Sequence, residues 1–170
     1  MAYFEWADDM VIDNGVIDQE HRVLVDLVNE LHTATSRGMG QTVVASILRR
    51  AIDSTREHLT HEEDIMAREG FPDLEEHKLR HQEFMNSLYD LERRLQTGGI
   101  TVAAQLSRVL RDWLSLHIRR GDKELRRFVQ RREREQERAR LQAKIQGRTQ
   151  AAGQIGMQAG KNGAGRLPGK

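Results

Sequence analysis

The chain contains no cysteine. This absence excludes a disulfide framework, a cysteine-ligated iron–sulfur cluster and a thiol nucleophile. Any metal that the protein binds must therefore be held mainly by histidine and carboxylate side chains. Seven histidines and 26 aspartates and glutamates supply such donors.

Long apolar segments are also missing. No window approaches 18 uninterrupted apolar residues, so the sequence predicts no transmembrane helix. The first residues, MAYFEWADDMVIDNG, lack both the basic start and the apolar stretch of a secretory signal. We therefore expect a soluble, cytoplasmic protein.

Proline and aromatic residues are scarce, at two prolines and 5% aromatics, which favours helix. A length of 170 residues accommodates one compact domain with a tail. Residues 123–170 carry 13 basic and 4 acidic side chains, whereas residues 1–122 carry 14 basic and 22 acidic ones. An acidic domain is thus followed by a basic extension.

The basic extension divides by composition. Residues 123–148 are rich in Arg and Glu and predict a helical extension, whereas residues 149–170 are rich in Gly and predict a disordered tail. Clustered basic side chains would attract an acidic partner, whether membrane surface, nucleic acid or protein. Interleaved glutamates and the lack of aromatics after Phe128 argue against specific nucleic-acid readout. A solvated appendage without a partner is the simpler alternative.

Helical periodicity divides residues 1–122 into four segments, after an irregular N-terminal arm that holds Phe4 and Trp6. The predicted helices span about residues 18–36, 41–69, 73–97 and 100–120. Asp73 is the predicted N-cap of the third. Short turns between long helices favour antiparallel neighbours. The sequence therefore predicts an all-α fold, an up-down-up-down four-helix bundle.

The hexapeptide HLTHEE raises the question of a binding site. His58 and Glu62 are four residues apart, so they share one face of a helix, whereas His61 and Glu63 point elsewhere. Polar residues at this spacing are most often a solvated face or a stabilising pair, so the motif alone is weak.

The bundle topology strengthens this signal. His77 and His81, near the start of the third predicted helix, are again four residues apart. His21 near the start of the first helix and His117 near the end of the fourth lie at the same end of the bundle as His58. Five of the seven histidines therefore meet at one end, which scattered surface histidines would seldom do.

Asp122 is five residues after His117, which places the two side chains roughly 140° apart on a regular helix. Asp122 could reach the same centre only if the helix loosened locally. Gly121 lowers the cost of a π-type turn, so the sequence predicts such a distortion here.

Five imidazoles and two carboxylates are too many donors for one tetrahedral zinc ion, and the HExxH spacing is absent. Two six-coordinate metals would use these donors, with both carboxylates and an oxide or hydroxide as bridges, and would leave one position open. Imidazole-rich coordination fits iron. The pattern favours a dinuclear centre that reversibly binds one small ligand.

At these motifs the sequence resembles the single-domain bacterial hemerythrins. The resemblance rests on DQEH at Asp18–His21, HLTHEEDIM at His58–Met66, the pair His77 and His81, and HIRRGD at His117–Asp122. It covers about residues 3–122 and implies a non-haem di-iron protein that reversibly binds dioxygen. The implied iron ligands are His77, His81 and His117 on one iron, His21 and His58 on the other, and Glu62 and Asp122 as bridges. Dioxygen would bind the open position of the two-histidine iron.

The resemblance also implies an apolar oxygen pocket formed by Leu59, Trp113, Leu114 and Ile118. Dry walls exclude water and proton donors, although the same positions would also be ordinary bundle core. Leu59 stands where the family usually has phenylalanine, which leaves the shape of the pocket open. Glu20 stands where the family often has glutamine.

Two histidines are not among the implied ligands. His61 is expected at the surface or as an outer partner of the site. His32 lies about 16 Å from His21 along the same helix, so we expect it to be satisfied locally or to interact with the helix C-terminus.

Three uses of such a centre are open: oxygen carriage, storage or delivery; sensing of oxygen or redox state; and detoxification of peroxide or nitric oxide. No signalling domain is recognisable in the sequence, which weighs against a sensor. No pair of proton donors is evident around the pocket, which weighs against an enzyme. The sequence predicts a non-enzymatic oxygen-binding protein, with weak peroxidase or nitric oxide reductase-like activity as the alternative.

Overall fold

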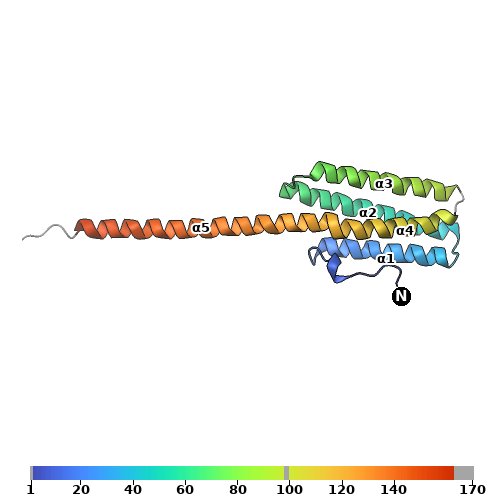
Figure 1. The fold of residues 1–170 in the computed structure, drawn as a ribbon, viewed down its shortest axis with the longest axis horizontal. Helices are drawn as coiled ribbons and strands as arrows, with labels where there is room; N and C mark the ends of the chain where they lie inside the picture. Colours follow the sequence, from blue (N-terminus) through green and yellow to red (C-terminus); the bar gives the residue numbers. More distant parts are fainter. Residues whose placement is uncertain (1, 98–99, 163–170) are drawn as a thin grey trace, which may run out of the picture. The chain divides into compact units, whose positions relative to one another are not determined.

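The structure is a computed structural model that describes residues 2–97 and 100–162. It divides into two compact units, residues 1–128 and 129–170. The first unit contains α1 (Val16–Ser36), α2 (Gln41–Glu69), α3 (Leu74–Gln96) and α4 (Ile100–Leu116). Both α1 and α3 pack against α2 and α4, as Figure 1 shows. This arrangement confirms the predicted all-α, up-down-up-down four-helix bundle.

Each helix of the bundle buries an apolar stripe. The stripe of α1 recurs at the spacing of one helical face and consists of Leu24, Val25, Val28 and Leu31. Facing residues of α2 and α4, such as Leu48 and Leu106, are fully enclosed. Complete burial of a side chain of this size contributes about 1.5–3 kcal/mol. The core therefore extends along the bundle and supports the polar cluster at one end.

Local hydrogen bonds set the ends of α1 and α2. The Asp13 carboxylate accepts hydrogen bonds from the backbone N–H groups of Gly15, Ile17 and Asp18, so α1 begins two residues before its predicted start. At the end of α2, Gly70 adopts the left-handed conformation, with φ 67° and ψ 43°. Glycine suits this position because it has no Cβ. The bounds of α2 are those predicted.

Asp73 occupies the predicted N-cap position of α3 but makes no side-chain capping hydrogen bond. The arm before α1 is also more ordered than predicted, because it contains a 3-10 turn at Asp8–Met10. Asn29 of α1 holds this arm by donating to the carbonyl of Phe4 and accepting from its N–H, at 2.8 and 2.7 Å. Phe4 and Met10 are consequently buried.

The end of α4 is distorted as the sequence predicts. Residues His117–Asp122 form a π-helical segment, and α5 (Lys123–Asn162) follows directly. A Cβ atom on Gly121 would lie 3.1 Å from Cε1 of His77, closer than an ordinary contact. Glycine therefore allows α3 to approach the π-helical segment closely.

The compact unit extends beyond the predicted boundary at residue 122. Leu125 is buried, and the ring of Phe128 packs edge-on against Phe71 at 5.3 Å between centroids. The structure also differs from the predicted tail, because α5 continues as a helix from residue 149 to Asn162. Alanine and glutamine are good helix formers and offset glycines that cost about 1 kcal/mol each. Residues 163–170 of that tail lie outside the described residues.

In the second unit, every side chain from Glu133 to Gln150 is exposed. Within the described residues, no helix has the length and apolar character needed to cross a membrane.

Candidate metal centre

The structure brings all seven predicted ligands together at one end of the bundle. Helix α1 supplies His21, α2 supplies His58 and Glu62, α3 supplies His77 and His81, and the π-helical segment supplies His117 and Asp122. All seven side chains are buried. Side chains from four helical segments thus meet, as the four-residue spacings and the bundle topology together predicted.

The donor atoms form two overlapping groups. One group consists of His21, His58, His117 and Asp122, and the other of Glu62, His77, His81 and His117. Within each group, the donor atoms lie within 4.8 Å of one another. His117 belongs to both groups, which suggests two adjacent positions for a cation.

Asp122 contacts one histidine of α1 and one histidine of its own π-helical segment. Its Oδ2 atom lies 2.8 Å from Nε2 of His21, and its Oδ1 atom lies 3.0 Å from Nε2 of His117. On a regular helix, the five-residue step from His117 would turn Asp122 away. The π-helical segment therefore makes this contact possible.

Glu62 faces the histidines of α3. Its Oε1 atom lies 3.2 Å from Nε2 of His77, and its Oε2 atom lies 3.4 Å from Nε2 of His81. The same Oε2 atom lies 3.2 Å from Nε2 of His117. Glu62 and Asp122 thus approach His117 from two directions.

Several buried donor atoms at the centre lack a hydrogen bond. They include both carboxylate oxygens of Glu62 and of Asp122, together with Nε2 of His77 and of His81. Buried polar groups without partners are rare, because no hydrogen bond offsets the free-energy cost of removing them from water. Cations coordinate carboxylate oxygens and neutral imidazoles together. The residues present therefore fit a metal site.

Two further carboxylates hold the outer nitrogens of ligand-candidate histidines. Oε2 of Glu20 lies 3.0 Å from Nδ1 of His58, and Oε1 of Glu63 lies 2.7 Å from Nδ1 of His81. A carboxylate accepts, so Nδ1 carries the proton and the Nε2 lone pair faces the centre. Such partners orient a metal-binding histidine and increase its basicity.

His61 contacts Glu20 on the side that faces away from the centre. Its Nδ1 atom lies 2.9 Å from Oε1 of Glu20, so Glu20 is held between His61 and His58. This agrees with the prediction that His61 is an outer partner. His32, which was not expected at the site, stacks on Tyr3 with 3.7 Å between ring centroids.

Burial keeps two of the central imidazoles, His21 and His117, neutral. Burial lowers the pKa of His21 to about 2, and the nearby imidazoles of His58 and His117 add to the effect. Burial also lowers the pKa of His117 to about 4, although the Glu62 carboxylate opposes this shift. A neutral imidazole is the form that binds a metal.

The two central carboxyl groups shift in opposite directions. Burial alone would raise the pKa of Glu62, but the close imidazoles of His117, His77 and His81 hold this pKa well below its ordinary value. Burial raises the pKa of Asp122 well above its ordinary value, and the negative charge of Glu62 raises it further. The two carboxylates repel each other unless cations lie between them.

The predicted pocket residues occupy different surroundings. Leu59, Leu114 and Ile118 are buried. Trp113 is partly exposed and stacks on His117, with 4.4 Å between ring centroids and 11° between planes. It also stacks on Phe84, at 3.6 Å between centroids. Trp113 thus lies beside the three-histidine group.

The roles of Glu20 and Glu63 were not recognised from the sequence. Both act across helix pairs, Glu20 from α1 onto α2 and Glu63 from α2 onto α3. An available signal was that each directly adjoins a candidate ligand, His21 or Glu62, because metal-binding histidines commonly have a carboxylate as an outer partner.

Comparison with known proteins places this geometry in a family. A family model described as "Hemerythrin HHE cation binding domain" matches residues 13–129. The bacteriohemerythrin of Stenotrophomonas maltophilia is 33% identical over 123 residues, which cover 72% of this chain and 79% of that protein. The bacteriohemerythrin of Methylococcus capsulatus is 31% identical over 124 residues, 72% of this chain and 94% of that one.

Comparison with solved structures points to the same family. A wild-type hemerythrin structure has a TM-score of 0.66 at 30% identity and covers 72% of this chain and 94% of its own. An L114A mutant of hemerythrin has a TM-score of 0.69 at 29% identity, over 75% and 98% of the two chains. Both the matched residues and the bundle contain the seven candidate ligands. The chain therefore belongs to the hemerythrin family.

Proposed function

We propose that the protein reversibly binds dioxygen at a centre of two iron ions. The convergence of five Nε2 atoms and two buried carboxylates in overlapping groups carries this proposal. The proposed ligands are His77, His81 and His117 for one iron, His21 and His58 for the other, and Glu62 and Asp122 as bridges. Family membership supports the same assignment.

The donor set favours two irons over a single zinc ion. Seven donor residues exceed the four that a tetrahedral zinc site uses, and imidazole-rich sites suit iron. When bound, two ferrous ions would supply the electrons that dioxygen takes up and recover them when it leaves. The two bridging carboxylates would hold the ions side by side and offset their positive charge.

The surrounding residues have separate tasks in this proposal. Glu20 and Glu63 hold His58 and His81 with Nε2 directed at the centre. Leu59, buried beside His58 in the chain, helps to exclude water. With Leu114 and Ile118 it introduces no proton donor. This apolar surrounding favours reversible binding over turnover of peroxide or nitric oxide.

Anaerobic spectroscopy tests the proposal. We expect the reduced, iron-loaded protein to develop an absorption band with oxygen and to lose it under argon over repeated cycles. Parallel mixing with peroxide and nitric oxide tests for turnover. A protein that takes up iron but consumes these compounds catalytically and never releases oxygen would contradict the carrier function.

We also propose that α5 binds an acidic partner through charge. Residues 129–150 carry seven basic and three acidic side chains, and nearly all of these side chains are exposed. Clustered Arg and Lys side chains give attraction that weakens with salt. Retention on polyglutamate at low salt, lost at high salt and in a chain that ends at Arg132, is the expected result.

A further inference from the structure

Among the described residues, two histidines of the three-histidine group, His77 and His117, lack an outer hydrogen-bond acceptor, as does the buried Nδ1 atom of His21 on the other side. Metal-binding histidines almost always donate their second N–H to a carboxylate, a backbone carbonyl or water. Glu20 serves His58 in this way and Glu63 serves His81. His77 and His117 also direct Nε2 to the centre, so their Nδ1 atoms face outward. Within the described part of the chain, no residue forms a hydrogen bond with either Nδ1 atom.

These two rings border the same cavity. It has a volume of about 190 Å³ and is lined by His77, His81, His117, Trp113, Leu116, Gly121, Arg80 and Arg120. A Cβ on Gly121 would lie 3.5 Å from Nδ1 of His117 and 3.1 Å from Cε1 of His77. The absence of a side chain at Gly121 therefore leaves space beside both rings.

Two arginines border this cavity, one weakly paired and the other unpaired within the described residues. Nη1 of Arg80 is 3.9 Å from Oε1 of Glu76, and both side chains are more than half exposed, so this ion pair is weak. The side chain of Arg120 has no ion pair or hydrogen bond with any described residue. The cavity wall thus carries positive charge that the protein does not neutralise.

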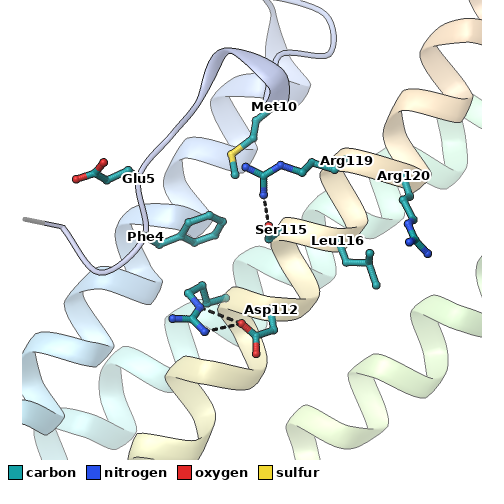
Figure 2. A pocket seen from close by; sticks show the side chains of 9 residues that line it. Phe4, Glu5, Met10, Asp112, Ser115, Leu116, Arg119 and Arg120 are labelled. Atoms are coloured by element: carbon teal, nitrogen blue, oxygen red, sulfur yellow. Dashed lines mark hydrogen bonds and ion pairs between the residues drawn. The ribbon is translucent and has the colours of Figure 1, made fainter.

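The neighbouring cavity provides a contrast. It has a volume of about 530 Å³ and also includes Arg120 and Leu116, but its other arginines are paired. Arg119 pairs with Asp9 and hydrogen-bonds to Ser115, and Arg111 pairs with Asp112. Figure 2 shows Arg119 directed toward the N-terminal arm and Arg120 directed away from it. Arg120 is therefore available on the side of the smaller cavity.

We propose that the smaller cavity binds a small oxyanion beside the metal centre. The anion would accept hydrogen bonds from the Nδ1–H groups of His77 and His117, as Glu20 and Glu63 accept them from His58 and His81. Arg80 and Arg120 would stabilise its charge. This site rests on the proposed function, because a cation on Nε2 leaves the proton on Nδ1.

The bound anion would complete the outer hydrogen bonds of the three-histidine group. Water could also accept these hydrogen bonds, but two guanidinium groups favour an anion over a neutral molecule. A tetrahedral or planar oxyanion offers several oxygens, so it can contact both imidazoles and a guanidinium together. Inorganic phosphate is a suitable probe.

Calorimetric titration of phosphate into the metal-loaded, full-length protein tests the site. An Arg80→Gln, Arg120→Gln variant should bind phosphate about tenfold more weakly, since each exposed charge pair contributes modestly. An Arg93→Gln, Arg94→Gln variant removes the same charge from exposed positions at the other end of α3 and should bind phosphate like the unaltered protein.

A second readout locates the anion. Phosphorus-31 relaxation should be enhanced by the paramagnetic metal centre in the unaltered protein and less so in the Arg80→Gln, Arg120→Gln variant. Equal phosphate affinity in all three proteins, or no binding by the unaltered protein, would overturn the anion site. Metal content is measured on the same samples. A chain without metal would contradict the proposed function, whereas a loaded chain without arginine-dependent binding contradicts the anion site alone.

Discussion

The two sides of the candidate metal centre use similar donors in different surroundings. On the two-histidine side, the rings of His21 and His58 are almost completely enclosed, with exposed fractions of 0% and 1%. On the three-histidine side, His77, His81 and His117 line a cavity bordered by arginines. One side is thus shielded from water and the other is accessible to small polar molecules.

This difference shows how a bundle can separate two properties of one centre. The enclosed side protects a bound ligand from water and protons. The accessible side can be influenced by what binds at the outer nitrogens of its histidines, because these hydrogen bonds alter ligand basicity. We expect substitutions on the two sides to have different consequences.

The largest effect should follow removal of one of the two carboxylates that both sides would share. Asp122→Ala removes the oxygens that lie beside His21 and His117. We expect iron affinity to fall by about 100-fold or more, beyond the loss typical of an outer partner. His61→Ala is the control, because His61 bonds to Glu20 and is not a candidate ligand. Two tightly bound irons in Asp122→Ala, measured by metal analysis after dialysis, would remove Asp122 from the ligand set.

Substitution of the outer carboxylates should separate the two sides. Glu20→Gln weakens the support of His58, and Glu63→Gln weakens that of His81, since each loses a charged acceptor. Each variant should lose about 10–100-fold in affinity for one of two irons. Stepwise ferrous titration of the metal-free protein checks this. Identical losses at both steps in both variants would show that the two sides are not independent.

The apolar cover of the enclosed side can be opened at Leu59. Leu59→Ala should cost about 2–5 kcal/mol of stability and speed the oxidation of the oxygenated protein several-fold, because water enters the cavity. Leu48→Ala is the matched control, as Leu48 is also buried in α2 but about 16 Å away along the helix. Oxidation half-lives decide the matter: equal half-lives in the two variants would show that Leu59 gives no specific protection.

Stability of the metal-free protein should fall in mild acid. His21 and His117 have pKa values of about 2 and about 4 in the folded chain, against 6.5 when unfolded. Below about pH 6.5, these two imidazoles therefore bind protons in the unfolded chain but not in the folded chain. The raised pKa of Asp122 has the opposite effect on stability, but only this one carboxyl group opposes the two imidazoles.

Urea unfolding of the metal-free protein should thus give a lower midpoint at about pH 5 than at about pH 7.5. Substitution of His21 should reduce this dependence. A midpoint that rises toward pH 5 would contradict the neutral state assigned to these imidazoles.

The smallest effect on the centre should come from shortening α5. A chain that ends at Arg132 retains the whole first unit, residues 1–128. We expect its iron content and oxygen spectrum to equal those of the full chain. Loss of iron on truncation would show that the second unit supports the bundle.

Much of the fold followed from periodicity and from a few special residues. The span of α2 could be predicted because Gly70 and Pro72 end an amphipathic pattern that begins at Gln41. The π-helical segment could be predicted because His117 and Asp122 can meet at one centre only if the helix loosens. These inferences depend on local geometry.

The features that escaped prediction depend on contacts between distant segments. Glu20 reaches His58 across 38 positions of the chain, and no local pattern reports that contact. The stack of Trp113 on both His117 and Phe84 also joins distant segments, and its place in an oxygen pocket stays a prediction. The cavity between Arg80 and Arg120 likewise exists only once α3 lies against the π-helical segment.

Anomalous scattering at the iron edge, from crystals of the iron-loaded protein, tests the central claim most directly. Two peaks should lie within bonding distance of Nε2 atoms, one by His77, His81 and His117 and the other by His21 and His58. Glu62 and Asp122 should each contact both peaks. A single peak, or a second iron bound outside these residues, would contradict a two-iron centre with one enclosed and one accessible side.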